Sequence, residues 1–125
     1  MKNDNAKFKV EFKKRIYNKV LQLIKFIDKL SRDSVCSVMS KQLLRSGTSV
    51  LANYIEANES LGKNDFYMRL KICRKEMKES IMWLKLTIPT GNEDKTQKHL
   101  IVEGTEIMKI FGSIITKIYK NYSKE

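Results

Sequence analysis

The sequence predicts an all-α protein, an antiparallel up-down-up-down four-helix bundle. Apolar residues recur at spacings of three and four in four long segments, which is the pattern of amphipathic helices. Short polar stretches rich in Gly, Ser, Asn or Pro separate these segments, and alternating strand patterns are nearly absent. Four long helices joined by short loops favour antiparallel neighbours. A length of 125 residues fits one domain, residues 1–125, with a single core.

The first helix is expected over residues 5–30. One continuous apolar stripe runs along it, made of Phe8, Phe12, Ile16, Val20, Leu23, Ile27 and Leu30. The stretch "SRDS" (31–34) contains residues that favour helix N-caps, so it predicts a break and the start of the second helix.

The second helix is expected to end near Asn58. "NESLGKN" (58–64) then forms a loop in which Asn64 is the candidate N-cap, and the third helix begins at Asp65. Its predicted core positions follow an unbroken repeat of four and three: Phe66, Leu70, Cys73, Met77, Ile81, Leu84 and Ile88.

"TIPTGN" (87–92) ends the third helix, and the fourth is expected to begin near Glu93 and Asp94, whose charges suit a helix N-terminus. This helix carries two apolar stripes. The second stripe indicates either a further packing partner, such as another copy of the chain, or simply a wide core face. The first stripe contains Leu100, Ile107, Phe111, Ile114 and Ile118, and the second contains Ile101, Met108, Ile115 and Tyr119.

The charge is strongly positive, +11 overall, and it is unevenly spread. Residues 1–33 carry a net charge of +6 and residues 61–90 carry +4. Such segments attract polyanions. Cys36 and Cys73 lie far apart in apolar surroundings, and the N-terminus lacks the apolar core of a signal peptide. These observations favour a cytoplasmic protein with reduced thiols.

One polar segment, "RSGTSVLANYIEA" (45–57), interrupts the apolar pattern of the second helix. Its small residues predict a close crossing with another helix, and a charge placed there needs a partner. We therefore expect Arg45 to pair with Glu76 or Glu79 of the third helix, and Ser49 and Asn53 to satisfy its remaining donors.

The segments 42–57 and 65–84 resemble the bacterial four helix bundle family. This family includes proteins encoded in intervening sequences of large-subunit ribosomal RNA genes, and it is related to the accessory variability proteins of diversity-generating retroelements. The resemblance implies an antiparallel bundle that assembles into rings, typically pentamers, while the retroelement relatives bind a reverse transcriptase and nucleic acid. The matching residues are Arg45, Ser46, Ser49, Asn53, Phe66, Lys75, Glu76, Glu79, Trp83 and Leu84.

Catalysis finds little support in the sequence, and we expect a protein that is not an enzyme and needs no cofactor. The single histidine, His99, has no second histidine or cysteine near it to bind a metal. Ser46 and Ser49 fit packing roles better than nucleophilic ones. The glycines are isolated, so no phosphate-binding loop is indicated.

Nucleic-acid binding is the sharper hypothesis. Basic residues on the first and third helices, interpreted as neighbours, predict a surface for RNA or DNA, although lysines also serve solubility alone. An alternative is a protein–protein or accessory role, for example for a reverse transcriptase, without nucleic-acid contact. Membrane binding is not expected, because the core uses the apolar face of the first helix. The candidate binding residues are Lys13, Lys14, Arg15, Lys19, Lys71, Lys75, Lys78 and Lys85.

Overall fold

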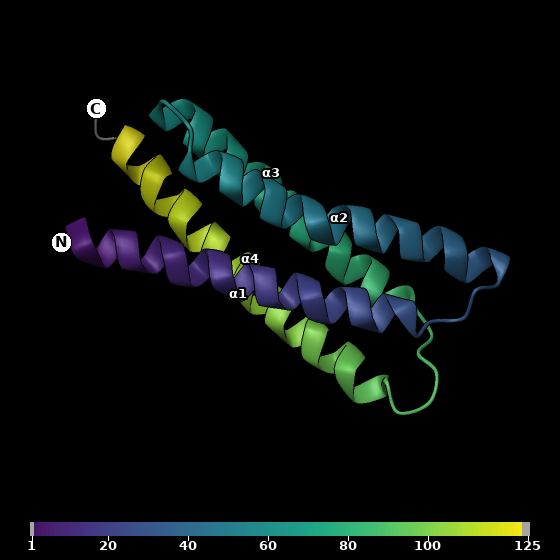
Figure 1. Ribbon diagram of the computed structural model, residues 1–125. Coiled ribbons are helices and arrows are strands. Elements are labelled where there is room, and N and C mark those ends of the chain that lie inside the picture. The colour runs from purple at the N-terminus through teal and green to yellow at the C-terminus, as the bar shows by residue number, and fades with distance from the viewer. Residues whose placement is uncertain (1, 124–125) are drawn as a thin grey trace.

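Four helices form an antiparallel bundle in the computed structural model, which describes the backbone of residues 2–123 and the side chains of residues 4–121 (Figure 1). They are α1 (Lys2–Asp28), α2 (Ser34–Asn58), α3 (Lys63–Leu86) and α4 (Asp94–Ser123). The predicted fold class is confirmed. Each helix packs against its neighbours in the chain, and α4 closes the bundle on α1. The helices α1 and α3 lie on a diagonal of the bundle, and their backbones do not approach closely within the described residues, so the expectation that these two basic helices are neighbours was wrong.

The helix boundaries follow local chemistry. Asp33 caps α2: its Oδ1 accepts a hydrogen bond from the backbone N–H of Cys36 at 2.9 Å, and its Oδ2 accepts one from Ser31 Oγ at 3.0 Å. The expected N-cap at Asn64 was wrong. The helix α3 begins at Lys63, after Gly62 in an extended conformation, and Asn64 lies in its first turn.

The core fills the bundle in two parts. Near one end, Phe12 of α1 packs edge-on against Tyr54 of α2, with ring centroids 5.1 Å apart, and lies 5.2 Å from Phe111 of α4. Towards the other end, the buried residues are Leu23, Phe26, Leu30, Leu43, Leu84 and Leu100.

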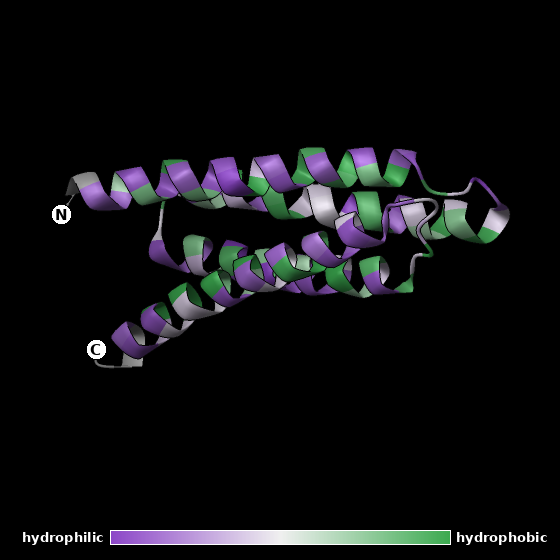
Figure 2. Cartoon of the chain, turned by 90° about the horizontal axis from the view of Figure 1, so that it is seen from below, coloured by the Kyte–Doolittle hydropathy of each residue, from purple (hydrophilic) through white to green (hydrophobic). Residues whose placement is uncertain are grey.

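Two predicted core residues lie outside the core. Phe8 is 43% exposed, because α1 and α4 diverge towards the end that carries both termini (Figures 1 and 2). Ile88 follows the end of α3 and is exposed in the loop. Phe26 is buried, although the predicted stripe omits it.

The second apolar stripe of α4 belongs mostly to the bundle itself. Ile115 is buried, and Ile101 and Met108 are half-buried against the core, while Tyr119 is exposed. Of the two interpretations of this stripe, the structure favours a wide core face.

Two glycines mark the closest helix approaches. A Cβ at Gly47 of α2 would overlap Leu23 Cδ2 of α1, and a Cβ at Gly104 of α4 would lie 3.2 Å from Ile81 Cγ1 of α3. The small residue at Gly47 therefore has the role that the sequence predicted for it. Ala52, in contrast, is exposed.

Candidate nucleic-acid interface

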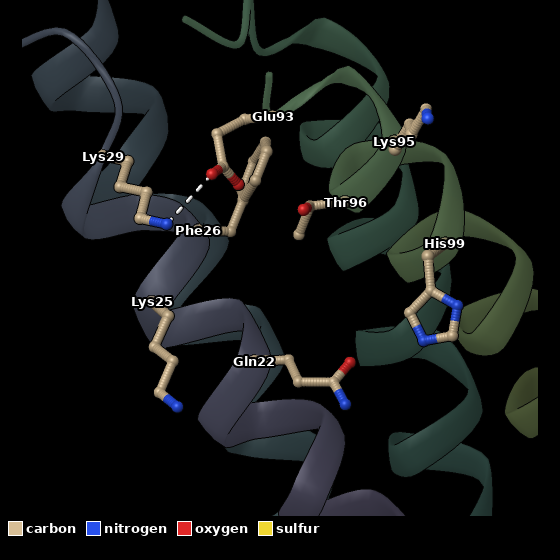
Figure 3. Close-up of a pocket in the computed structure, with 8 residues that line it drawn as sticks. All are labelled: Gln22, Lys25, Phe26, Lys29, Glu93, Lys95, Thr96 and His99. Carbon is tan, nitrogen blue, oxygen red and sulfur yellow. Dashed lines mark hydrogen bonds and ion pairs between the residues drawn. The ribbon is translucent and has the colours of Figure 1, made fainter. Parts of the chain in front are cut away.

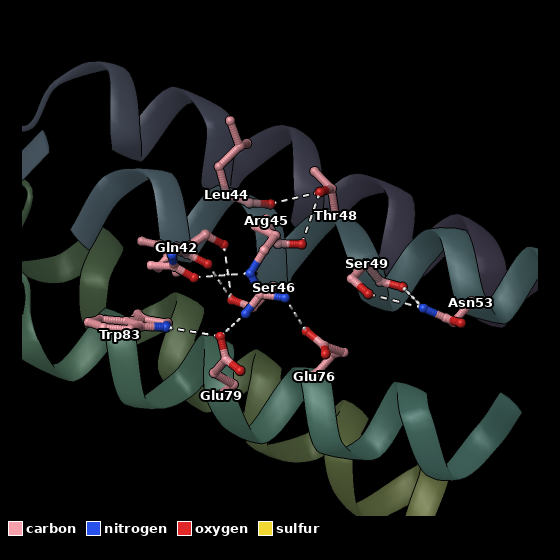
Figure 4. Close-up of polar contacts among 11 residues, drawn as sticks. Gln42, Leu44, Arg45, Ser46, Thr48, Ser49, Asn53, Glu76, Glu79 and Trp83 are labelled. Atoms are coloured by element: carbon pink, nitrogen blue, oxygen red, sulfur yellow. Dashed lines mark hydrogen bonds and ion pairs between the residues drawn. The ribbon is translucent and has the colours of Figure 1, made fainter. Parts of the chain in front are cut away.

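The sequence predicted that Arg45 of α2 pairs with Glu76 or Glu79 of α3, and in the structure it binds both. Its Nη1 donates to Glu76 Oε2 at 3.1 Å, and its Nη2 contacts Glu79 Oε2 (Figure 4). Trp83 Nε1 donates to the same Glu79 oxygen at 3.2 Å. The Arg45 side chain is 48% exposed while that of Glu76 is only 11% exposed, so the network lies at the surface edge of the helix contact. We call Arg45, Glu76 and Glu79 the α2–α3 seam.

The other polar residues of this segment serve different partners. Ser46 is buried, and its hydroxyl donates to the Gln42 carbonyl oxygen at 2.9 Å. Asn53 Nδ2 donates to the Ser49 carbonyl oxygen at 2.9 Å, and Asn53 Oδ1 accepts from Arg69 Nη1 at 3.0 Å. The expectation that Ser49 and Asn53 satisfy Arg45 was therefore wrong. They support α2 itself and its contact with Arg69 of α3.

A second bridge of the same design joins α1 to α4, and the sequence analysis missed it. Arg15 Nε donates to Glu103 Oε1 at 2.9 Å, and Arg15 Nη2 contacts both Glu103 and Glu106. In both bridges one arginine binds two glutamates that lie three residues apart. We call Arg15, Glu103 and Glu106 the α1–α4 seam. Arg15, a candidate for nucleic-acid binding, is committed to this pairing.

Lys19, another candidate, is buried with only 4% of its surface exposed. Burial lowers the pKa of Lys19 to about 8, although the charge of Glu103 acts in the opposite direction. The expectation of Lys19 as a surface contact was wrong. The sequence held a signal: Ile16, Lys19, Leu23 and Phe26 follow the three-four-three spacing of a buried stripe.

The two seams pair the glutamates of α3 and α4 with arginines. Within residues 66–86 and 95–123 the acidic residues are Glu76, Glu79, Glu103 and Glu106, and all four pair with arginines in the seams. In the described part of the chain, the exposed basic side chains of α3 beyond Leu70 have no ion-pair partner. We call them the basic face: Lys71, Arg74, Lys75, Lys78 and Lys85.

The basic face is continuous with an open, partly apolar hollow of about 640 Å³. Met68 and Ile72 of α3 and Met108 of α4 line this hollow beside the basic side chains. Lys71 Nζ also lies 5.3 Å from the centroid of the Tyr67 ring. The basic face therefore combines positive charge with a shallow apolar hollow.

Exposed apolar side chains gather on the opposite side of the bundle. Val10, Tyr17, Leu21 and Ile24 follow spacings of seven, four and three along α1 and are all exposed. This stripe lies on the flank of α1 opposite Arg15 and Lys19, which face α4, so it borders α2. On α2, Leu44 and Ile55 are exposed and Leu51 is half-buried. Their helical spacing places them beside Gly47, which contacts α1. We call Val10, Tyr17, Leu21, Ile24, Leu44, Leu51 and Ile55 the apolar face.

A second hollow, of about 450 Å³, lies between α1 and the start of α4 (Figure 3). Lys29 Nζ and Glu93 Oε1 form an ion pair of 3.0 Å at its edge, and this contact lowers the pKa of Glu93. Gln22 and His99 extend into the space, whereas Lys95 points away from it (Figure 3). Because Lys29 and Glu93 neutralise each other, this hollow is less positive than the basic face.

The described residues offer few groups for chemistry. Cys36 and Cys73 are free and buried, and burial raises the pKa of the Cys73 thiol to about 12, which keeps it unreactive. Among residues 4–121, no three His, Cys, Asp or Glu side chains are grouped to hold a metal ion. No described helix is both long enough and apolar enough to span a bilayer.

Comparison with known proteins identifies the family. The model of a family described as 23S rRNA-intervening sequence protein matches residues 9–113. This chain belongs to that family. The match includes the motif residues of α2 and α3, and it confirms the predicted resemblance.

A solved structure agrees with this assignment. It is the crystal structure of a protein with unknown function from the S23 ribosomal protein family of Bacteroides thetaiotaomicron. The two sequences are 30% identical, and the two structures superpose with a TM-score of 0.74. The alignment covers 86% of this chain and 97% of that chain. None of the curated proteins matches this chain.

Proposed function

We propose that this member of the 23S rRNA-intervening sequence protein family is a non-enzymatic homo-oligomer that binds nucleic acid through the basic face of α3. One observation carries this proposal: the glutamates of α3 and α4 are paired in the seams, while the five basic residues of the basic face have no such partner. Unpaired surface lysines and arginines can bind phosphates and release their counterions.

Self-association supports the same role. The apolar face of α1 and α2 offers a surface for a second copy, and the family resemblance makes a ring of five the expected form. In a ring the basic face is repeated, so weak contacts act together through effective concentration. The two faces lie on different helix pairs, so assembly leaves the basic face accessible.

The surroundings of Ser46 and His99, which the sequence analysis set aside as catalytic residues, support a non-enzymatic role. The Ser46 hydroxyl donates to backbone carbonyl oxygens of its own helix. His99 is exposed on α4, and it lies far from Ser46 and Ser49 in the sequence. The family description makes RNA the first polyanion to test.

The test compares two variants with equal loss of charge. In the first, Lys71, Lys75, Lys78 and Lys85 of α3 are changed to Gln, and in the control, Lys7, Lys13, Lys14 and Lys25 of α1 are changed to Gln. Lys13 and Lys14 were candidates for binding on the expectation that α1 and α3 are neighbours, and because these helices lie on a diagonal we propose that both lysines are outside the interface. All eight lysines are exposed, and Gln keeps the helix propensity nearly unchanged. Affinity for RNA and for DNA is measured over a salt series, after circular dichroism and sizing have shown that the variants fold and assemble.

We expect the α3 variant to bind more weakly and to lose about three units from the slope of log affinity against log salt, because each lost phosphate contact removes a little under one unit. The α1 control should keep most of the parent slope. Coincident lines for parent and α3 variant, or an equal loss in the control, would contradict the proposal. A parent without measurable binding at low salt would favour the alternative of a protein partner.

A further inference from the structure

A separate pocket opens at the end of the bundle where both chain termini lie. It has a volume of about 420 Å³ and forms where α1 and α4 diverge, beside the end of α2 and the beginning of α3 (Figures 1 and 2). Phe8, Tyr54 and Phe66 line it together with Ile114, and Lys9 and Lys117 belong to the same lining. It is distinct from the basic face, which lies further along α3.

The aromatic wall of this pocket is fixed at its base and open at its rim. Tyr54 is 2% exposed and is held by Phe12 and Phe111, with ring centroids 5.1 and 5.9 Å away. Phe8 stacks on Phe12 with centroids 5.4 Å apart and an interplanar angle of 27°, and it remains substantially exposed. An exposed ring on a rigid aromatic base is a stacking platform that loses little freedom on binding.

The two lysines give the same pocket a positive rim. Lys9 and Lys117 are both exposed, and in the described part of the chain neither has an ion-pair partner. Lys9 Nζ lies 5.9 Å from the centroid of the Phe66 ring, so the ammonium group and an aromatic face occupy the same site. Asn5 adds an amide to the lining, which can donate or accept hydrogen bonds.

We propose that this pocket takes one unstacked nucleobase, with the phosphates that flank it bound by Lys9 and Lys117. This inference rests on the proposed function, which makes nucleic acid the partner. It adds a second contact with that partner, separate from the basic face. Proteins hold unpaired bases by stacking them on aromatic rings beside basic side chains, and this pocket supplies both. A purely apolar ligand would leave the two ammonium groups without a partner, whereas a nucleotide satisfies rings and charges together.

The experiment isolates a single base. One probe is a five-nucleotide DNA strand whose central sugar carries 2-aminopurine and whose other sugars carry no base, and the second probe lacks the central base as well. Both strands have the same phosphates, so any difference in affinity reports on the base. We expect the parent protein to bind the base-containing strand about tenfold more tightly and to quench its fluorescence, as stacking on one aromatic platform predicts.

Variants locate the contact. Phe8→Leu keeps an apolar side chain but removes the ring, and it should lower the preference for the base at least about threefold. Tyr119→Leu is the control, an exposed aromatic on α4 that does not line the pocket, and it should leave the preference unchanged. Changing Lys9 and Lys117 to Gln should weaken binding of both strands, unlike the same changes at Lys25 and Lys120, which lie on the same helices outside the pocket.

The outcomes separate this inference from the proposed function. Equal affinity of the parent for the two strands, no binding of either strand, or an unchanged preference in Phe8→Leu would overturn the pocket assignment. If the base preference holds but the four-lysine α3 variant keeps the parent's salt slope for RNA, the pocket stands and the basic face is wrong. If the α3 variant loses affinity while the base makes no difference, the basic face stands and the pocket is wrong.

Discussion

The two sides of this bundle differ although they are built from helices of the same kind. Among the described side chains, α1 and α2 carry nine exposed large apolar residues, whereas α3 and α4 carry five. The basic face lies on the side with fewer apolar residues. An exposed apolar surface favours contact with protein, and an unpaired basic surface favours contact with phosphate. One small domain therefore offers two surfaces of different chemistry.

The placement of the glutamates produces the positive charge of the basic face. Arg45 from α2 and Arg15 from α1 each bind two glutamates, and these contacts lie in the seams between the two sides. Exposed ion pairs add little to stability. Their larger effect here is on the surface charge, because they withdraw negative charge from α3 and α4 and leave the lysines of α3 dominant.

The largest expected effect is on assembly. Leu21→Asp places a charge in the apolar face of α1, and burying an unpaired charge against a second copy is strongly unfavourable. We expect light scattering at micromolar concentration to show a multiple of 14.6 kDa for the parent, with five copies as the expected number, and 14.6 kDa for this variant.

Met82→Asp is the matched control, because Met82 of α3 is 44% exposed and Leu21 is 43% exposed. It should keep the parent mass. Dissociation by Met82→Asp alone would move the assembly surface to α3 and reverse the comparison of the two sides, and a monomeric parent would remove self-assembly altogether.

Lys19 should reduce stability at neutral pH. Its folded-state pKa of about 8 lies below the ordinary 10.5, so between these values the unfolded chain binds more protons, and the free energy of unfolding rises with pH. Lys19→Met should therefore stabilise the protein by about 2–3 kcal/mol at pH 7, with the gain shrinking above pH 8. Urea melts of parent and variant from pH 7 to 10 measure this difference, and a gain that does not depend on pH would contradict it.

The close approach of α1 and α2 gives a smaller effect. Gly47→Ala would force Leu23 to move and should destabilise the protein by about 1–2 kcal/mol, as overpacking does. Gly112→Ala is the control: no atom lies within 4 Å of its added Cβ, so replacing glycine inside α4 should stabilise by about 0.5–1 kcal/mol. Thermal melts that shift in the same direction for both would show that helix propensity, and not packing, dominates at Gly47.

The smallest effect concerns the α2–α3 seam. Because the Arg45 side chain is about half exposed, Arg45→Ala should lower the melting temperature only slightly, while it frees Glu76 and Glu79 to oppose the positive charge of α3. Nucleic-acid affinity should fall more than stability does. A large loss of stability with unchanged affinity would show that the seam is mainly structural.

The sequence predicted the helices well because their signals are local. Apolar spacing located α1, α3 and α4, and the loops before and after it located α2. The stretch "SRDS" (31–34) was predicted to begin α2, and Asp33 within it is the N-cap. The pairing of Arg45 with Glu76 and Glu79 was also predicted, since small residues beside an arginine indicate a helix crossing. The nucleic-acid role of the basic residues stays a prediction.

The errors came from relations between distant segments. Arg15 and Glu103 are 88 residues apart, and no local pattern indicates their contact. The diagonal position of α1 and α3 could have been inferred, because an up-down-up-down bundle places successive helices side by side. Lys19 was misassigned on residue type alone, although its spacing with Ile16 and Leu23 placed it inside the bundle.

The divergence of α1 and α4 also has a consequence for the order of folding. Of the neighbouring helix pairs, α2 and α3 share the most extensive contact, and α1 and α4 share the least. The pair α1 and α4 also joins the two ends of the chain, so its closure carries the largest loss of loop entropy. We expect α2 and α3 to form the nucleus and the α1–α4 contact to close last. For the same reason, amide hydrogens at the end that carries both termini should exchange fastest under native conditions.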